Sequence, residues 1–281
     1  SIATQEYLNF ASGRCGYTHF LDYDGHIIDD MIFAVKSETE VLGVPNASMA
    51  PIMLDWLSAL LPDDGSIAIQ DLSDRTSILA LQGPMSEHIL TDAIGRDNAV
   101  GRFACQDIAD NSPGISGWIQ GTGYTGERGY EIFVGNEQVT LLWDALLEAG
   151  QSHGLVPVGL GARDTLRLEK GYLLSGQDFL WPGLGIQPEA DLPEGFLVRD
   201  TAETAVPYGL DAEHDFVGRK HVLDSLESGD RWHGLECLDR GPSPRPGHAV
   251  LSADEDGASV LGYVTSGGPS PSLGRTGIAM A

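Results

Sequence analysis

The first sixty residues combine strand-like and helix-like patterns of hydrophobic positions. Apolar residues dominate CGYTHFL, HIIDDMIFAV and VLGV, while the intervening DYDG and KSETE are rich in turn-forming residues. Residues 14–44 are therefore predicted to form a β-meander. Asn46 then stands where a helix N-cap is expected, and apolar side chains recur at helical spacing until Pro62. We expect this helix to pack on the meander.

Later segments mix strand and helix patterns, and no internal repeat is evident. Further strands are predicted at 67–70, 77–81, near Trp118 and at 130–134, and further helices after Pro84, over 137–149 and from Gly159. Residues 180–211 lack periodicity and are rich in proline, glycine and acids, so we expect a long loop or arm there.

The C-terminal part has a different pattern. From Trp232 onward, HGLECL, HAVL and SVLGYVTSG are short strand-like runs separated by turn residues, which predicts a small β-barrel. The order of elements indicates an α+β protein. We expect an α/β region over residues 1–230 and an incomplete barrel over 231–281.

Composition adds an unusual charge balance. The 281 residues are 42% hydrophobic, enough for a folded core, and carry a formal charge of −25. Only three of the sixteen basic residues are lysines: Lys36, Lys170 and Lys220. Self-repulsion at this charge is largely screened at high salt, so the pattern favours a halophile's protein over an acidic mesophilic one. Nucleic-acid binding is disfavoured in either case.

Cysteine spacing and hydropathy indicate the cellular compartment in which the protein is expected. Cys15, Cys105 and Cys237 are far apart in the sequence and form no CxxC motif, so they suggest neither a zinc site nor a disulfide framework. No apolar run approaches the roughly 20 residues of a membrane span, and SIATQEYLNF lacks the features of a signal peptide. We expect a soluble, cytoplasmic protein.

The strand HIIDDMIFAV contains two adjacent acids. Because strand side chains alternate, Asp29 and Asp30 face opposite ways, and each interrupts an apolar face. A carboxylate on a buried face is costly unless it is hydrogen-bonded or its pKa rises, which makes it a functional candidate. The alternative, with one acid in water and the other on a backbone N–H or an arginine, stays open.

The segment GTGYTGERGYEIF is dense in glycine, which indicates close backbone approach. It can be a tight hairpin with Glu131 in solvent. Alternatively, Tyr124 stacks on a flat ring while Glu131 accepts two parallel N–H donors from it. The pattern by itself favours the hairpin.

The segment GLGARDTLRLEKGYLLSGQDF predicts a helix with Arg163 and Arg167 one turn apart and with Asp164 and Glu169 available for ion pairs. A salt-bridged surface helix explains this pattern. An arginine near a helix N-terminus also offers a planar fork for an anionic or carbonyl-bearing ligand.

Six motifs, considered together, are similar to those of a known protein family: GHIIDDMIF, VPNAS, LALQGP, GYTGERGYEI, GLGARDTLRLEKG and VTSGGPSPSLG. In order and rough spacing they resemble the T-protein family of the glycine cleavage system, the aminomethyltransferases. The resemblance implies a three-part cloverleaf of the T-protein type, in which two α/β parts hold folate at a central opening and a small C-terminal β-barrel follows.

The resemblance also implies roles for single residues. It assigns the essential catalytic acid to Asp30 and makes Asp29 a secondary candidate. Glu131 is expected on the amino and ring N–H edge of the pterin. The other expected folate contacts are Tyr17, Asn46, Tyr124, Tyr172 and Arg163.

The implied reaction moves an aminomethyl carbon from the lipoyl arm of the H-protein to tetrahydrofolate, releases ammonia and needs no metal. A folate-dependent demethylase of the same superfamily is one alternative. A folate-binding protein that supports iron-sulfur assembly is another, although its KGCYxGQ signature is absent, since residues 169–177 are EKGYLLSGQ. Compared with the family, the chain looks truncated at both ends, and the arm at 180–198 is longer than usual.

Overall fold

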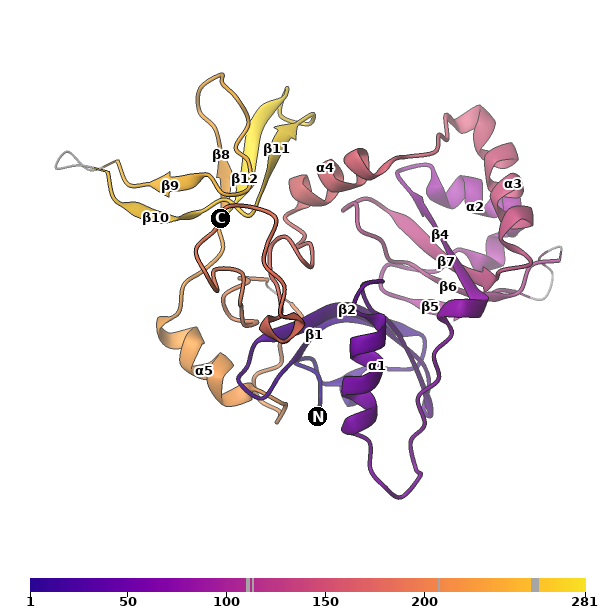
Figure 1. The fold of residues 1–281 in the computed structure, drawn as a ribbon. Helices are drawn as coiled ribbons and strands as arrows, with labels where there is room; N and C mark the ends of the chain where they lie inside the picture. Colours follow the sequence, from indigo (N-terminus) through magenta and orange to yellow (C-terminus); the bar gives the residue numbers. More distant parts are fainter. Residues whose placement is uncertain (110–111, 113, 207, 254–257) are drawn as a thin grey trace. The chain divides into compact units, whose positions relative to one another are not determined.

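The computed structural model describes residues 1–109, 112, 114–206, 208–253 and 258–281 (Figure 1). Contacts between residues divide the chain into two compact units. Unit 1 comprises Ser1–Glu6, Thr18–Asp30 and Leu160–Ala281, and unit 2 comprises Tyr7–Tyr17 and Met31–Gly159. The expected domain boundary at residue 230 is not tested by this division and stays a prediction.

The predicted meander is present. Strands β1 (Arg14–Leu21), β2 (Ile27–Ser37) and β3 (Glu40–Val44) form one sheet in the order β1-β2-β3. In the turn before β2, Asp22 Oδ1 accepts hydrogen bonds from the backbone N–H groups of Asp24 (3.0 Å) and His26 (2.9 Å). Gly25 has a φ of +87°, and a Cβ there would lie 2.6 Å from the His221 side chain, so the turn requires glycine.

The helix after the meander, α1 (Ala50–Ala59), begins later than expected. Its N-cap is Met49, which makes no side-chain cap hydrogen bond, so the predicted role of Asn46 as helix cap is wrong. Asn46 instead accepts a backbone hydrogen bond from Met49 (2.9 Å) through its carbonyl. Pro51 suits the first turn, where a missing N–H costs nothing. The predicted strand at 67–70 is also wrong, because this segment has no regular structure.

Unit 2 contains an antiparallel sheet in the order β4-β7-β6-β5. Its strands are β4 (Thr76–Gln82), β5 (Cys105–Asp107), β6 (Gly117–Gln120) and β7 (Gly129–Gly135). Helices α2 (Ser86–Ile94) and α3 (Val139–Gly150) lie together on one face of it (Figure 1). Ile119, Ile132 and Leu142 belong to the hydrophobic core that includes these helices. Because strand side chains alternate, Gln120 and Glu131 lie on the opposite face.

Unit 1 contains helices α4 (Leu160–Lys170) and α5 (Arg219–Ser228) and the strands near the C-terminus. Its hydrophobic core joins residues from distant segments: Leu21, Ile27, Leu168, Leu173, Phe179, Ala202, Phe216, Val222, Trp232 and Met280. The described residues of the segment 180–211 form mainly irregular chain, as expected, with one short 3-10 helix at Pro182–Leu184. The other 3-10 helices are Tyr7–Asn9, Ser73–Arg75, Arg96–Asn98 and Gln151–His153.

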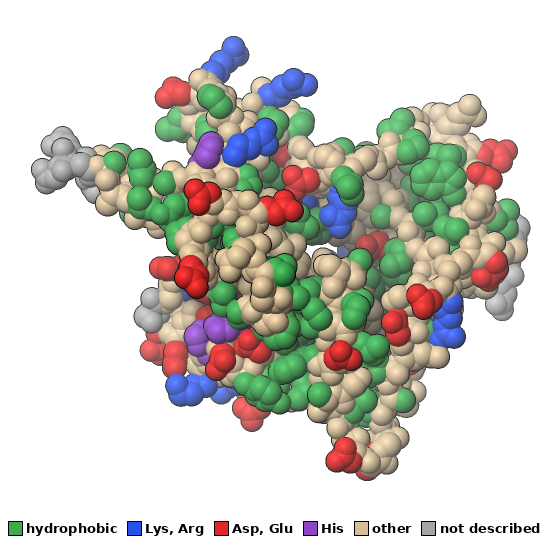
Figure 2. Space-filling model, in the orientation of Figure 1, with side chains coloured by type: hydrophobic (Ala, Val, Ile, Leu, Met, Phe, Trp, Pro, Cys, Tyr) green, Lys and Arg blue, Asp and Glu red, His purple; other side chains and the backbone are tan. Residues whose placement is uncertain are grey.

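The C-terminal strands form two open sheets among the described residues. Strands β8 (Gly234–Glu236), β11 (Ser266–Ser270) and β12 (Thr276–Met280) pair in the order β11-β12-β8, and β9 (Ala249–Leu251) pairs with β10 (Val260–Tyr263). The predicted strands are therefore present, but the closed barrel and the cloverleaf are not confirmed. In Figure 2, apolar side chains lie on the surface of the β9-β10 pair, where Leu251, Val260 and Leu261 are exposed.

Within the described parts of the chain, no helix is both long enough and apolar enough to cross a bilayer.

Candidate functional site

The glycine-rich segment of unit 2 connects β6 to β7 and packs around the side chain of Gln82. A Cβ on Gly123 would lie 2.0 Å from Gln82 Oε1, and one on Gly129 would lie 2.3 Å from Gln82 Nε2. The Gln82 amide donates to the carbonyls of Thr122 (3.1 Å) and Tyr130 (3.3 Å) and accepts from Thr125 Oγ1 (2.8 Å). Glycine is thus needed at both positions for the backbone to lie this close to Gln82, and the motifs LALQGP and GYTGE pack against each other.

Glu131 lies at the start of β7 in this structure and is half-buried. Thr122 Oγ1 donates a hydrogen bond of 2.5 Å to its Oε2 atom. The hairpin interpretation of the segment is confirmed, since β6 and β7 are antiparallel neighbours. The expected position of Glu131 in solvent is wrong, because Glu131 is half-buried and accepts a hydrogen bond from Thr122. Tyr124, in the connecting loop, is also half-buried.

Gln120 lies directly opposite Glu131 in the β6-β7 register and is fully buried. Its Oε1 atom is 3.3 Å from Thr122 Oγ1. Its Nε2 atom has no hydrogen-bond partner among the described residues. The sequence patterns did not single out Gln120. The available signal is a large polar side chain in the strand WIQ, directly before the glycine-rich segment.

Cys105 lies beside Gln120 as its partner in the β5-β6 register, and a second cysteine, Cys15, contacts Cys105. The Cys15 backbone N–H donates to the carbonyl of Phe103 (2.9 Å). A hydrogen bond between the two thiols, then burial, and then the charges of Cys105 and Glu131 raise the pKa of Cys15. All three cysteines of the chain are free thiols. Sequence spacing gave no sign that Cys15 and Cys105 would meet, because β1 and β5 are brought together only by the fold.

The two remaining candidates of unit 2 are Tyr17 and Asn46. Tyr17 lies in β1, Asn46 precedes α1, and both are half-buried. Their expected contacts with folate are not tested here.

The acid pair belongs to unit 1, and the structure distinguishes its members. Asp29 is fully buried, whereas Asp30 is partly exposed. Burial, followed by the neighbouring charges of Tyr172 and Asp30, raises the pKa of Tyr208 to about 12. Asp30, Tyr172 and Tyr208 are therefore electrostatic neighbours. Tyr208 was not singled out in the sequence because it lies in the irregular arm, where no pattern assigns it a partner.

The two arginines of α4 differ in burial. Arg163 is exposed in the first turn, as a ligand-binding arginine would be. Arg167 is fully buried, so the expected surface helix is wrong at this position. Its guanidinium bonds Asp164 Oδ1 (2.7 Å from Nη2) and Asp178 Oδ2 (2.7 Å from Nη1). The expected intrahelical pair is thus made by Asp164, whereas Glu169 accepts from Ser270 and Ser272.

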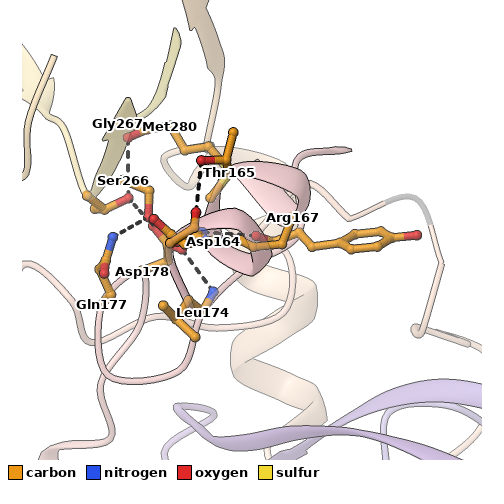
Figure 3. Close-up of polar contacts among 12 residues, drawn as sticks. Asp164, Thr165, Arg167, Leu174, Gln177, Asp178, Ser266, Gly267 and Met280 are labelled. Atoms are coloured by element: carbon orange, nitrogen blue, oxygen red, sulfur yellow. Dashed lines mark hydrogen bonds and ion pairs between the residues drawn. The ribbon is translucent and has the colours of Figure 1, made fainter. Parts of the chain in front are cut away.

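Figure 3 shows how Asp178 completes this network. Its Oδ1 accepts from Thr265 Oγ1 (2.6 Å) and Ser266 Oγ (2.6 Å), and its Oδ2 accepts from the Leu174 N–H (2.9 Å) as well as from Arg167. Arg167 also donates to the backbone carbonyl of Tyr172 (3.1 Å). The network fixes the chain that carries Tyr172 against α4 and β11.

Among the residues that the structure describes, one group of side chains has ligand atoms close enough together to hold a metal ion. These are Asp22, Asp24 and His26 in the β1-β2 turn. Asp22 already accepts the backbone N–H groups of the turn and the indole N–H of Trp181 (2.9 Å). This bonding explains the cluster as part of the turn.

Comparison with known proteins identifies the family. Residues 1–180 match the family model described as the GCVT N-terminal domain. The aminomethyltransferase of Bacillus subtilis is 35% identical over 287 residues, which is 99% of this chain and 72% of that protein. The chain belongs to the aminomethyltransferase family. The aminomethyltransferase of Geobacillus thermodenitrificans is 34% identical, with the same coverage of both chains.

A solved structure agrees with this assignment. The glycine cleavage system aminomethyltransferase T of Bartonella henselae superposes with a TM-score of 0.76 at 28% identity, covering 99% of this chain and 70% of that one. The aminomethyltransferase family and the mixed α and β architecture expected from the motifs are thereby confirmed. The roles of the individual site residues are not tested by these similarities.

Proposed function

We propose that the chain transfers the aminomethyl carbon carried on a lipoyl arm to tetrahydrofolate and releases ammonia. The observation that supports this most directly is the position of Glu131 in unit 2. A half-buried carboxylate that the Thr122 hydroxyl orients can accept two N–H donors from one edge of a flat heterocycle. The chemistry of these residues therefore fits a folate.

In unit 2, Glu131 would accept two parallel N–H donors from the pterin edge. The 2.5 Å hydrogen bond from Thr122 holds the carboxylate in one orientation, which lowers the entropy lost on binding. Tyr124 would stack on the ring, and Tyr17 and Asn46 would make further contacts with the folate.

In unit 1, Asp30 would act as a carboxylate near N10 of the folate. Bound tetrahydrofolate supplies the nitrogen, N5, that accepts the carbon. Asp30 would orient the folate and favour the positive charge that develops during transfer, a preorganised electrostatic contribution. Tyr172 would contact the folate from the same unit, as would the exposed Arg163, and the buried Asp29 would support the strand.

The family resemblance extends the proposal to partners and setting. The donor would be the lipoylated H-protein, and the reaction would need no metal, membrane or nucleic acid. A cytoplasmic location, a halophilic source, the three-part cloverleaf and the closed C-terminal barrel belong to the same proposal.

An assay of the chain with tetrahydrofolate and aminomethyl-loaded H-protein in high salt tests this function. We expect methylene-tetrahydrofolate and ammonia as products. The variant Asp30→Asn should lower turnover by about 10²-fold or more, the scale of losing one preorganised electrostatic group, while folate still binds. Near-normal turnover would refute the role of Asp30.

Asp24→Asn is the matched control, because it makes the same change at an exposed acid of the same unit. It should leave turnover unchanged. If methyl-tetrahydrofolate forms from a sulfonium or aryl ether donor and the aminomethyl donor is inactive, the chain is a demethylase instead.

A further inference from the structure

Cys15 and Cys105 are two buried thiols of unit 2 that the proposed reaction does not use. Arg14 in β1 and Ala104, which precedes β5, form an isolated antiparallel bridge. Each cysteine directly follows its bridge residue, and its backbone N–H makes one of the two hydrogen bonds (2.9 Å each) that flank the bridge. Because side chains alternate along extended chain, both cysteine side chains lie on the face opposite to those of the bridge residues.

The two thiols contact each other. Together with Ala34 they form a small buried cluster, and a hydrogen bond joins the two side chains. Cysteines whose side chains already meet can be linked without a large movement of the backbone. The fold therefore brings together, from strands far apart in the sequence, two sulfur atoms that are able to form a bond.

The two thiols differ in reactivity. The hydrogen bond from Cys15 lowers the pKa of Cys105, and the positive charges of Lys36 and Arg14 act in the same direction, against burial and Asp107. The same hydrogen bond, and then burial, raise the pKa of Cys15. Cys105 is also the more exposed of the two, at 7% against 2%. Because the thiolate is the nucleophile, a small oxidant is expected to react first at Cys105.

We propose that Cys15 and Cys105 are a redox-active pair that hydrogen peroxide closes to a reversible disulfide. The Cys105 sulfur attacks one peroxide oxygen, the O–O bond breaks, and the leaving hydroxide takes the thiol proton as water. The Cys15 sulfur then attacks the Cys105 sulfenic acid, so that the S–S bond forms and the S–O bond breaks with loss of a second water. Two thiols lose two electrons in total, and one peroxide gains them.

The pair lies beside the residues to which folate is assigned. Cys105, Gln120 and Glu131 are register partners in one row across β5, β6 and β7. Cys15 shares a face of β1 with Tyr17, and the charge of Glu131 acts on its thiol. A disulfide holds its sulfur atoms about 2.05 Å apart, closer than hydrogen-bonded thiols, so β1 and β5 must shift relative to each other. We expect this shift to weaken folate binding, a consequence that rests on the proposed function.

Mass spectrometry of the peroxide-treated chain tests the disulfide. The folded protein is treated, then unfolded and alkylated. The three free thiols should fall to one, that of Cys237, and a crosslinked peptide containing Cys15 and Cys105 should appear and be lost again with dithiothreitol. Cys237→Ser is the matched control and should still give the crosslink. Free thiols at both Cys15 and Cys105 after treatment, or a disulfide that contains Cys237, would overturn the proposal.

Cys15→Ser isolates the first step. Without its partner thiol, Cys105 should stop at the sulfenic acid, which dimedone traps as an adduct. Cys105→Ser should give no adduct at Cys15, because the remaining thiol lacks the neighbour that activates the pair. Adducts at Cys15 and none at Cys105 would contradict the assigned order of reaction.

Calorimetry measures the effect on the folate site, with tetrahydrofolate added after the peroxide has been removed. The oxidised chain should bind about 5- to 10-fold more weakly than the reduced chain, the scale of one hydrogen bond lost to the shift. Peroxide treatment should not change the affinity of Cys105→Ser. Equal affinities of the oxidised and reduced chains would overturn the link to folate binding. If the disulfide forms but the reduced chain binds no folate, the proposed function fails instead.

Discussion

The molecule contains two buried polar clusters that differ in how completely they are paired. The Arg167–Asp178 pair in unit 1 is enclosed by hydroxyls, a backbone N–H and a carbonyl, and the carboxylate accepts four hydrogen bonds. The Glu131–Gln120 pair in unit 2 shares one hydroxyl and contains a buried amide nitrogen without a partner among the described residues. The saturated cluster stabilises the fold, whereas a half-buried carboxylate such as Glu131 can also accept hydrogen bonds from a ligand.

The difference has a simple physical basis. A buried charge is tolerated only when it is paired and hydrogen-bonded, and breaking such a pair leaves an uncompensated charge. Asp178 depends on Arg167, and therefore the pair is expected to matter mainly for stability. Glu131 is half-buried and keeps access to solvent or ligand, so that its removal is expected to matter mainly for binding.

The largest effect is expected from Arg167→Met. It leaves the Asp178 carboxylate buried without its cation and should lower the free energy of unfolding by about 3 to 5 kcal/mol. Urea unfolding in high salt measures this change. Arg163→Met, the same substitution one turn away at an exposed position, should cost much less.

The double variant Arg167→Met, Asp178→Leu sharpens this prediction. With both charges gone, no uncompensated ion stays in the core, and apolar replacements of buried pairs are often neutral. It should therefore be more stable than Arg167→Met. A double variant as unstable as the single one would show that the hydroxyls and backbone groups, and not the charge, set the cost.

The next effect is expected from Glu131→Gln. One of its amide N–H groups would face the donors of the pterin, at a cost of about 1 to 3 kcal/mol in folate affinity, or roughly 5- to 150-fold in Kd. Stability in urea should change little. Unchanged affinity by calorimetry would contradict the assignment of Glu131, and a large loss of stability would contradict the distinction between the clusters.

Local patterns predicted most of the regular elements. The meander, α2, α3, α4, β4, β6 and β7 lie where periodicity indicates them. Three elements were missed, namely β5, β12 and α5. β5 (Cys105–Asp107) is short and lies at the end of its sheet, and β12 lies between β11 and β8. Such strands depend on pairing with neighbouring strands, about which residue patterns carry little information.

The site residues divide in the same way. Motif resemblance assigned roles to Asp30, Glu131 and Arg163, and these roles stay predictions. The glycine-rich pattern correctly indicated close packing, here by Gln82. The burial of Arg167 depends on β11, which is far away in the sequence, and the partners of Gln120 depend on the pairing of β6 with β5 and β7. Helical spacing alone indicated that Arg167 is on the surface, because its partner Asp178 lies outside the helix.

The smallest effect is expected from Lys220→Met. Lys220 forms an ion pair with Asp224 at 2.9 Å, nearly as short as the Arg167–Asp178 pair, but its side chain is 92% exposed. In water each partner is solvated after the other is removed, so the free energy of unfolding should fall by less than about 0.5 kcal/mol. High salt should reduce the effect further through screening. If urea unfolding gave a loss close to that of Arg167→Met, burial would not be what distinguishes the ion pairs of unit 1.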